Sequence, residues 1–231
     1  MKADVVIVNY RTHVKTANAV SSVLAHCDVG KIIVVDNSDA SAHWVSLVEI
    51  LLPECTNELV SDCHCIDGKL IVLKAPGNLG FGGGCNFAVE NGGLGSQLIW
   101  FVNSDCELYE DVLEPLASGM AESEYVALSS VVYNQGSSRD YSEGNIQVWR
   151  VSNFFGWFRN VAEGYDEAKI EPSGVIESFS CYGASFVVRR AQFVAIGGFD
   201  ENYFMYLEET DLIYRLKAML GGKCGFVAKS R

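Results

Sequence analysis

Long apolar runs and basic residues are both scarce in this 231-residue sequence. No stretch approaches the roughly 20 consecutive apolar residues that span a bilayer. Residues 1–10 also lack the long apolar core and the cleavage site of a secretory signal. Seventeen Lys and Arg face 29 Asp and Glu, and the net charge of -12 opposes attraction to nucleic acid or anionic lipid. We therefore expect a cytoplasmic protein without a nucleic-acid partner.

Cysteine pairs with the spacing of a metal site are absent as well. The eight cysteines form no Cys-x-x-Cys motif, which is typical of reduced thiols in a cytosolic protein. The segment Cys63-His64-Cys65 suggests a soft-metal site, but it lacks the standard zinc spacing and a second half-site. We therefore expect neither a disulfide framework nor a structural zinc site.

What the sequence does contain is an alternation of apolar runs and helical patterns. Strands buried on both faces are expected at residues 4–9, 31–35, 69–73 and 98–102. Helices are expected at residues 12–26, 44–52, 84–90 and 208–220. Since strands joined by helical crossovers run parallel, we predict an α/β fold with a Rossmann-like, mixed and mostly parallel central sheet flanked by helices. The chain length fits one large domain.

Two of these helices have a recognisable apolar face. The apolar positions at helical spacing are Val14, Ala17, Val20, Val23 and Leu24 in the first helix, and Leu212, Leu216, Met219 and Leu220 in the last. In the last helix Glu208 or Asp211 can reach Arg215, and the Gly221-Gly222 pair ends the helix.

The second half of the chain is less regular. Residues 177–189 predict a strand pair or an edge strand, whereas residues 133–174 are polar and rich in Gly and Ser. That irregular segment contains a cluster of aromatic side chains: Trp149, Phe154, Phe155, Trp157 and Phe158. Aromatic residues in such a segment either cap the core or line a binding cleft.

Polar residues follow each predicted strand of the first half. Ligands of open parallel sheets bind outside the carboxyl ends of the strands, so these positions are candidate binding residues. They are Asn9 and Tyr10, Asp36 and Asn37, the segment 78–86, and the segment 103–105. Each one alone also fits an ordinary turn, because Asn, Asp and Gly favour turns for local backbone reasons.

The glycine-rich segment NLGFGGGCN follows the third predicted strand. A dinucleotide-binding fingerprint requires its glycines directly after the first strand, so that function is not indicated. Glycines at 80, 82, 83 and 84 let the backbone approach a phosphate or a sugar before a helix begins, or they form a tight loop with positive φ.

Two acidic groups stand out. Asp105 ends the run IWFVNSD, where a carboxylate can ligate a hard divalent cation or simply cap a helix. The segment FDENYFMYLEETDL places five carboxylates around an aromatic stretch, which is a natural wall for a sugar pocket. Helix capping alone explains Glu208 and Glu209, since a carboxylate is favoured at a helix amino terminus.

The order of these motifs resembles the family-two inverting glycosyltransferases of GT-A fold, especially their rhamnosyltransferase-like branch. The matching segments are VVIVNYRT, IIVVDNSD, NLGFGGGCN, IWFVNSDCEL, GASFVVRRAQFVAIGGFDE and YFMYLEETDLIYRLKAMLGG. They span nearly the whole chain. The resemblance implies a single GT-A catalytic domain over residues 1–231, with a nucleotide-sugar-binding half at 1–108 and an acceptor-side half at 109–231.

The resemblance also implies roles for individual residues. The implied nucleotide-sugar-binding residues are Asn9, Tyr10, Asp36, Asn78, Gly80, Gly83, Asn86, Asn103 and Gly183. Asp105 would hold Mg²⁺ or Mn²⁺ as the last carboxylate of an Asp-x-Asp-type motif, written here Asn103-Ser104-Asp105. Glu209 takes the position of the catalytic base, as Glu in place of the family's Asp. Glu208 and Asp211 remain alternatives for that base.

Family members continue past the last strand to a His that completes the metal site and to segments that bind acceptor or membrane. This sequence ends at Arg231. We therefore expect either a truncated carboxyl end or a supply of these functions from elsewhere. Peripheral association with the inner face of the membrane would then depend on absent segments, and a homo-oligomer is compatible with the pattern.

The implied function is transfer of a sugar from a UDP- or dTDP-linked donor to a hydroxyl of a glycan or lipid-linked acceptor, in surface polysaccharide synthesis. A non-catalytic nucleotide-sugar-binding domain is the alternative from another class. A sugar nucleotidyltransferase is less favoured, because NYRTHVKTANAV lacks a Gly-rich basic loop after the first strand. A glycosidase needs two carboxylates around one bond and has no use for a metal-bound diphosphate.

Overall fold

The computed structural model describes residues 1–53, 63–66, 68–122, 124–132, 149–151, 158–160 and 174–230. The side chains of the Cys63-His64-Cys65 segment and of the aromatic cluster in residues 149–158 lie outside this description. Predictions about those side chains therefore stay predictions.

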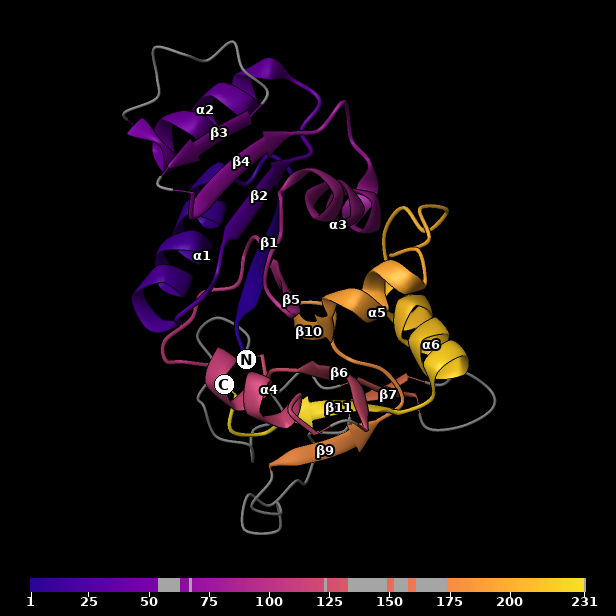
Figure 1. Cartoon of the computed structure of the whole chain (residues 1–231). Helices are drawn as coiled ribbons and strands as arrows, with labels where there is room; N and C mark the ends of the chain where they lie inside the picture. The colour runs from indigo at the N-terminus through magenta and orange to yellow at the C-terminus, as the bar shows by residue number, and fades with distance from the viewer. Residues whose placement is uncertain are drawn as a thin grey trace.

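A nine-stranded mixed sheet runs through the molecule in the order β3-β4-β2-β1-β5-β10-β6-β11-β9 (Figure 1). Its parallel half consists of β4 (Leu70–Lys74), β2 (Ile32–Asp36), β1 (Ala3–Asn9) and β5 (Leu98–Asn103). β10 (Ser185–Arg189) is antiparallel to both β5 and β6 (Tyr125–Ser129). The other sheet strands are β3 (Cys63–Ile66), β9 (Val175–Ser178) and β11 (Lys223–Val227), and a separate pair is formed by β7 (Trp149–Val151) and β8 (Phe158–Asn160).

Helices cover both faces of the sheet (Figure 1), and each face has its own apolar core. One core is made with α1 (His13–His26), α2 (Ser41–Leu51) and α4 (Leu113–Gly119). The other is made with α3 (Gly80–Asn91), α5 (Arg190–Ala195) and α6 (Glu208–Leu220). The predicted α/β class, with a mixed and mostly parallel central sheet flanked by helices, is thus confirmed.

The prediction that α3 begins near Gly84 is wrong, because the helix begins at Gly80. Glycine is a poor helix former, but here neighbouring side chains occupy the space of a Cβ. A Cβ on Gly84 would stand 2.9 Å from Cγ1 of Val8, and one on Gly82 would stand 3.0 Å from Cβ of Phe199. Close packing of the helix on the sheet therefore overrides its local propensity.

The apolar faces predicted for α1 and α6 are wider than the faces that the structure buries. Val14 and Leu24 of α1 are 58% and 46% exposed, and Met219 and Leu220 of α6 are 63% and 44% exposed. The buried positions are Thr16, Ala19, Val20 and Val23 in α1, and Glu208, Leu212, Ile213 and Leu216 in α6. Each helix covers the sheet with a narrow stripe, which leaves the flanking apolar side chains in solvent.

Two further predictions concern the second half. Residues 177–189 do contain two strand segments, but β9 pairs with β11 at the sheet edge and β10 lies between β5 and β6. The predicted Asp211–Arg215 ion pair is present at 2.7 Å, and Gly221 and Gly222 both have positive φ where α6 ends. Within the described part of the chain, no helix is long and apolar enough to cross a membrane.

Candidate functional site

The predicted strand-end residues meet at one edge of the sheet. β1, β2 and β5 are parallel, so Asn9, Asp36 and Asn103 at their carboxyl ends lie side by side. β10 runs the other way and begins at this same edge, where the carbonyl of Ala184 accepts a hydrogen bond from the Asn103 amide at 2.8 Å. The edge thus joins the ends of β1, β2 and β5 to the segment before β10.

Asn9 and Asp36 form a buried polar pair at the centre of this edge. Both side chains are fully buried, and Asn9 Nδ2 donates to Asp36 Oδ1 at 2.8 Å. Asn9 Oδ1 accepts from the Thr16 hydroxyl at 2.8 Å and from the Thr12 amide at 3.2 Å, both at the start of α1. The Asn9 amide therefore ties β1, β2 and α1 together.

The second carboxylate oxygen of Asp36 has a different environment. Oδ1 is engaged by Asn9 and by the backbone amide of Ser38 at 3.2 Å. Oδ2 is buried and has no hydrogen-bond partner among the described residues. A buried acceptor without a donor is costly, so this oxygen is available to a hydroxyl or N–H of a ligand.

Tyr10 and Arg11 form a more exposed cluster next to this pair. Arg11 has a φ of 59°, and its amide donates to Ser38 Oγ at 3.0 Å. Its guanidinium pairs with Asp39 at 2.6 Å and stands 4.9 Å from the centre of the Tyr10 ring. The Tyr10 hydroxyl donates to Asp39 at 3.2 Å. The cluster links the loops after β1 and β2.

The loop before α3 is held by Asn37. Asn37 Nδ2 donates to the Gly80 carbonyl at 2.8 Å and to Asn78 Oδ1 at 3.3 Å, while its Oδ1 accepts from the Leu79 amide at 3.0 Å. Asn78 Oδ1 also accepts from the Gly80 amide at 3.1 Å. The sequence indicates Asn37 as a candidate binding residue, and in the structure its side chain fixes this loop to the end of β2.

The glycines and Asn86 of α3 contact other parts of the protein. A Cβ on Gly80, whose φ is +73°, would stand 2.2 Å from the Phe204 carbonyl oxygen, and one on Gly83 would stand 2.9 Å from Cβ of Leu79. Asn86 donates to the Phe199 carbonyl at 2.9 Å and to Glu201 at 3.0 Å, and it accepts from the Phe199 amide. The space that these small residues leave is occupied by the chain itself.

Asp105 lies just beyond β5 and is exposed to solvent. Next to it, the Ser104 hydroxyl is 3.1 Å from that of Thr12. No group of three metal-ligating His, Cys, Asp or Glu side chains occurs in the described residues. A hard cation here would thus draw on one protein carboxylate, with its other oxygen ligands from a phosphate and water, which is the usual manner of Mg²⁺ binding.

Glu209 faces the same edge from the first turn of α6. A Cβ built on Gly183 would stand 3.2 Å from Cγ and 3.3 Å from Cδ of Glu209, so the two residues are in contact. The Thr210 hydroxyl donates to Glu209 Oε1 at 3.1 Å. Burial raises the pKa of Glu209 above its ordinary 4.5, against the opposing effect of these local hydrogen bonds.

The neighbouring carboxylates differ from Glu209. Glu208 is buried, and its Oε2 has no hydrogen-bond partner among the described residues. Burial, with a contribution from the Glu209 charge, raises the pKa of Glu208. Asp211 pairs with Arg215, whose guanidinium also donates to the Gly198 carbonyl at 2.8 Å. The Asp211 carboxylate thus belongs to a structural ion pair.

Tyr182 lies near two carboxylates that are far apart in the sequence, Asp105 and Glu209. Its side chain is half-buried, and it precedes both Gly183, which contacts Glu209, and Ala184, which contacts Asn103. Burial raises the pKa of the Tyr182 phenol, with further contributions from Cys106, Asp105 and Glu209. Charges act at short range in a protein, so Asp105 and Glu209 share the surroundings of this phenol. Sequence reasoning missed Tyr182, since no periodicity marks it.

An exposed apolar segment precedes α6. The consecutive side chains with high exposure are Tyr203, Phe204, Met205, Tyr206 and Leu207. Tyr206 and Leu207 both have positive φ, at 70° and 69°, which is unfavourable for residues with a large side chain. The Phe204 carbonyl accepts a hydrogen bond from the Phe81 amide at 3.2 Å, so the segment is fastened to the start of α3.

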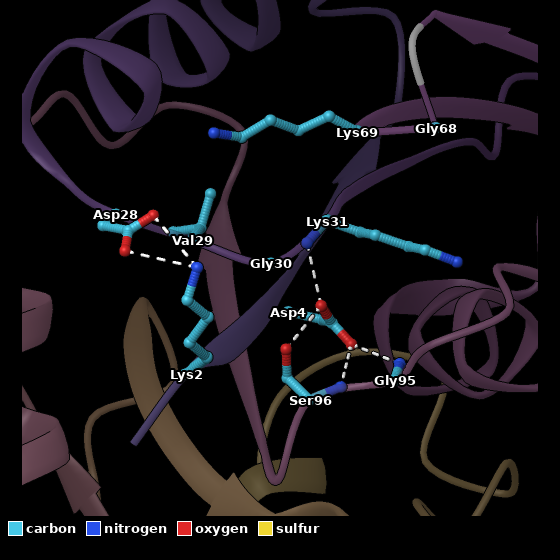
Figure 2. A pocket seen from close by; sticks show the side chains of 10 residues that line it. All are labelled: Lys2, Asp4, Asp28, Val29, Gly30, Lys31, Gly68, Lys69, Gly95 and Ser96. Atoms are coloured by element: carbon cyan, nitrogen blue, oxygen red, sulfur yellow. Dashed lines mark hydrogen bonds and ion pairs between the residues drawn. The ribbon is translucent and has the colours of Figure 1, made fainter.

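A separate cavity of about 470 Å³ lies at the opposite edge of the sheet, where β1, β2 and β4 begin (Figure 2). Lys2 pairs with Asp28 at 3.3 Å, and the side chains of Lys31 and Lys69 extend in different directions. The three ammonium groups therefore do not converge on one point where an anion could bind.

Asp4, which lines this cavity, has a structural role. Its carboxylate accepts four hydrogen bonds at 2.7 to 2.8 Å, and the donors are the Lys31, Gly95 and Ser96 amides and the Ser96 hydroxyl. It joins the turns before β2 and β5. The candidate functional site therefore remains at the carboxyl edge of the strands.

A mixed sheet of this kind, with polar strand ends gathered around a carboxylate after β5, is the GT-A fold of glycosyltransferases. The sequence profile of Glycosyl transferase family 2 matches residues 4–186. The chain therefore belongs to glycosyl transferase family 2.

One curated relative is the N-acetylglucosaminyl-diphospho-decaprenol L-rhamnosyltransferase of Mycobacterium tuberculosis (strain H37Rv). It is 40% identical over 73 residues, which are 31% of this chain and 22% of the relative. The match thus covers about a fifth of that enzyme's length.

Solved structures share the fold. GalNAc-T7 with UDP, GalNAc and Mn²⁺ superposes with a TM-score of 0.70 at 18% identity, over 98% of this chain and 42% of that one. The mannosyltransferase PcManGT from Pyrobaculum calidifontis, in complex with GDP-Man and Mn²⁺, gives 0.65 at 13% identity, over 99% and 55%. S. aureus TarS with UDP-GlcNAc gives 0.60 at 15% identity, over 99% and 56%. The chain spans about half the length of these proteins.

Proposed function

We propose that this domain is an inverting glycosyltransferase that moves a sugar from a nucleoside-diphosphate sugar to a hydroxyl of a glycan or lipid-linked acceptor. The observation that carries the proposal is that Asp105 and Glu209 both lie near one segment, Tyr182 to Ala184. A carboxylate for a diphosphate-bound cation and a carboxylate for a proton are the two acidic groups that such a transfer needs.

Glu209 is the base in this proposal. It accepts the proton of an acceptor hydroxyl while that oxygen attacks the anomeric carbon, and the bond from that carbon to the diphosphate breaks. One displacement inverts the configuration. Contact with Gly183 and the Thr210 hydrogen bond hold the Glu209 side chain in place. Its raised pKa makes it a stronger base than an exposed glutamate.

Asp105 is proposed to hold Mg²⁺ or Mn²⁺ together with the diphosphate. Its solvent exposure and the lack of further carboxylates beside it, among the described residues, suit a cation that the donor itself helps to coordinate. When bound, such a cation would neutralise the charge of the leaving diphosphate. The Mn²⁺ in two of the fold neighbours supports this assignment.

The nucleoside is assigned to the end of β2. The unpartnered Oδ2 of Asp36 is an acceptor for a ribose hydroxyl or a base N–H, and Tyr10 and Arg11 form the rim beside it. UDP and GDP-linked ligands in the fold neighbours support a nucleotide here. A UDP- or dTDP-linked donor is our specific proposal.

The acceptor is assigned to the side of α6. The exposed segment Tyr203 to Leu207 leads directly to Glu208 and Glu209, so it would form an apolar wall for the acceptor. The name of the Mycobacterium tuberculosis relative includes a diphospho-decaprenol, which supports a lipid-linked acceptor. Action at the inner face of the membrane, in surface polysaccharide synthesis, is part of our proposal.

Calorimetry with UDP, dTDP and GDP, each with and without MnCl₂, tests the proposal. We expect cation-dependent binding of at least one nucleotide, with binding lost in Asp36→Ala. Lack of binding at millimolar nucleotide would contradict the assignment. Slow hydrolysis of the bound nucleotide sugar, lost in Glu209→Gln while binding persists, separates an enzyme from a non-catalytic binding domain.

A further inference from the structure

Tyr182 lies near both proposed acidic groups, Asp105 and Glu209, and the proposed function gives it no role. The inference rests on the proposed function, which puts the diphosphate at Asp105 and the attacking hydroxyl at Glu209. In a single displacement, the anomeric carbon of the transferred sugar lies between the leaving diphosphate and the attacking hydroxyl. A side chain that lies near both carboxylates is therefore close to that sugar.

Backbone contacts also indicate that Tyr182 lies near Asp105 and Glu209, independently of the charge effects on its pKa. The segment that Tyr182 begins is fixed on one side by the hydrogen bond from the Asn103 amide to the Ala184 carbonyl, at 2.8 Å. On the other side, Gly183 is in contact with Glu209, with a built Cβ 3.2 Å from its Cγ. Tyr182 is half-buried, so part of its ring remains accessible to a ligand.

We propose that the Tyr182 hydroxyl hydrogen-bonds the transferred sugar and so helps to select the donor. A phenol suits this task, because its ring packs on the apolar face of a sugar and its hydroxyl recognises one sugar hydroxyl. A phenol keeps its proton at neutral pH, so the Tyr182 hydroxyl can donate this hydrogen bond.

The test compares nucleotides with their sugar conjugates. Calorimetry in MnCl₂ measures UDP and dTDP against UDP-glucose, UDP-N-acetylglucosamine and dTDP-rhamnose, for the wild type and for Tyr182→Phe. We expect the variant to bind the free nucleotides within about twofold of the wild type, and to bind the preferred conjugate about tenfold more weakly, since one hydrogen bond is lost.

The outcomes separate the inference from the proposed function. Weaker binding of the conjugate alone supports the sugar contact. Equal weakening of nucleotide and conjugate, or no weakening of either, overturns the inference and leaves the function standing. A wild type that binds no nucleotide overturns the function and the inference together.

Two further variants control for folding. Tyr214→Phe removes the hydroxyl of a tyrosine that is 62% exposed on α6, and its binding should match the wild type for every probe. Tyr182→Leu removes the ring together with its hydroxyl and should also show the selective loss of conjugate affinity. Thermal melting of each variant confirms that the compared proteins are folded.

Discussion

Gly183 and Glu209 are in direct contact across the boundary between the segment before β10 and the first turn of α6. A Cβ on Gly183 would stand 3.2 Å from Cγ and 3.3 Å from Cδ of Glu209. Gly183 is not among the glycines with positive φ. Added side-chain bulk at this position therefore acts on the Glu209 carboxylate and leaves the backbone of residue 183 unstrained.

Gly183→Ala should lower the turnover number about tenfold with little effect on nucleotide binding, because small displacements of a reacting group slow a reaction strongly. Steady-state donor hydrolysis and the melting temperature measure the two effects. Gly95→Ala is a matched control, since a Cβ there meets nothing within 4 Å. Unchanged turnover in Gly183→Ala would contradict the assignment of Glu209 as the base.

Glu209→Gln should lower the turnover number by roughly 10² to 10⁴, the usual contribution of a general base. The base acts in its ionised form, so activity should rise with pH through the pKa of Glu209. Burial places that pKa above 4.5. A pH–rate profile should show this acid limb in the wild type and in Glu209→Asp. A Gln variant that retains the limb would assign the base elsewhere.

Asp211→Asn should affect stability and leave the chemistry intact. Asp211 and Arg215 form a partly buried pair at 2.7 Å, with side-chain exposures of 20% and 24%. We expect urea unfolding to show that the free energy of unfolding falls by about 1 kcal/mol, and we expect the turnover number to stay within about threefold of the wild type. A large loss of turnover at unchanged stability would make Asp211 a candidate base again.

Glu208→Gln should stabilise the fold at neutral pH. Burial raises the pKa of Glu208, so its stabilising contribution is present below the unfolded pKa and is lost as pH rises through the folded pKa. The amide carries no charge and avoids that loss. Between pH 4 and pH 8, the melting temperature of Glu208→Gln should exceed that of the wild type only toward pH 8. The exposed Glu90→Gln should show no such trend, and a variant less stable at pH 8 would refute the expectation.

Asn9→Asp should destabilise the protein by about 2–4 kcal/mol at neutral pH, because it replaces a buried hydrogen bond to Asp36 with two facing carboxylates. Asn18→Asp is the matched control. Asn18 also donates to a carboxylate, Glu107 at 3.0 Å, but that pair is exposed. Asn18→Asp should lower the free energy of unfolding by less than about 1 kcal/mol. An equal loss in the two variants, measured by urea unfolding, would show that burial does not cause the larger loss expected for Asn9→Asp.

Local sequence patterns predicted much of the fold and the location of the strand-end residues. The apolar runs ending at Asn9, Asp36 and Asn103 are strands in the structure, and they bring these residues to one edge. The reason is geometric: consecutive parallel strands end on the same side of a sheet. The acidic start of the last helix at Glu208 was recognisable for a similar reason, because carboxylates favour the positive end of a helix.

Contacts between distant segments were not recognisable in this way. The start of α3 at Gly80 depends on Val8 and Phe199, which fill the space that a side chain would need. Nothing around Tyr182 in the sequence indicates that it lies near both Asp105 and Glu209, since that arrangement arises from the antiparallel insertion of β10 beside β5.

The sequence by itself determined the class of fold, the parallel half of the sheet and the set of polar strand ends, because periodicity and turn preference act over a few residues. Only the tertiary structure decided which carboxylates lie near one another, which belong to structural ion pairs, and at which glycines neighbouring side chains occupy the space of a Cβ. Those choices depend on packing between segments far apart in the chain, where burial sets the energy of each contact.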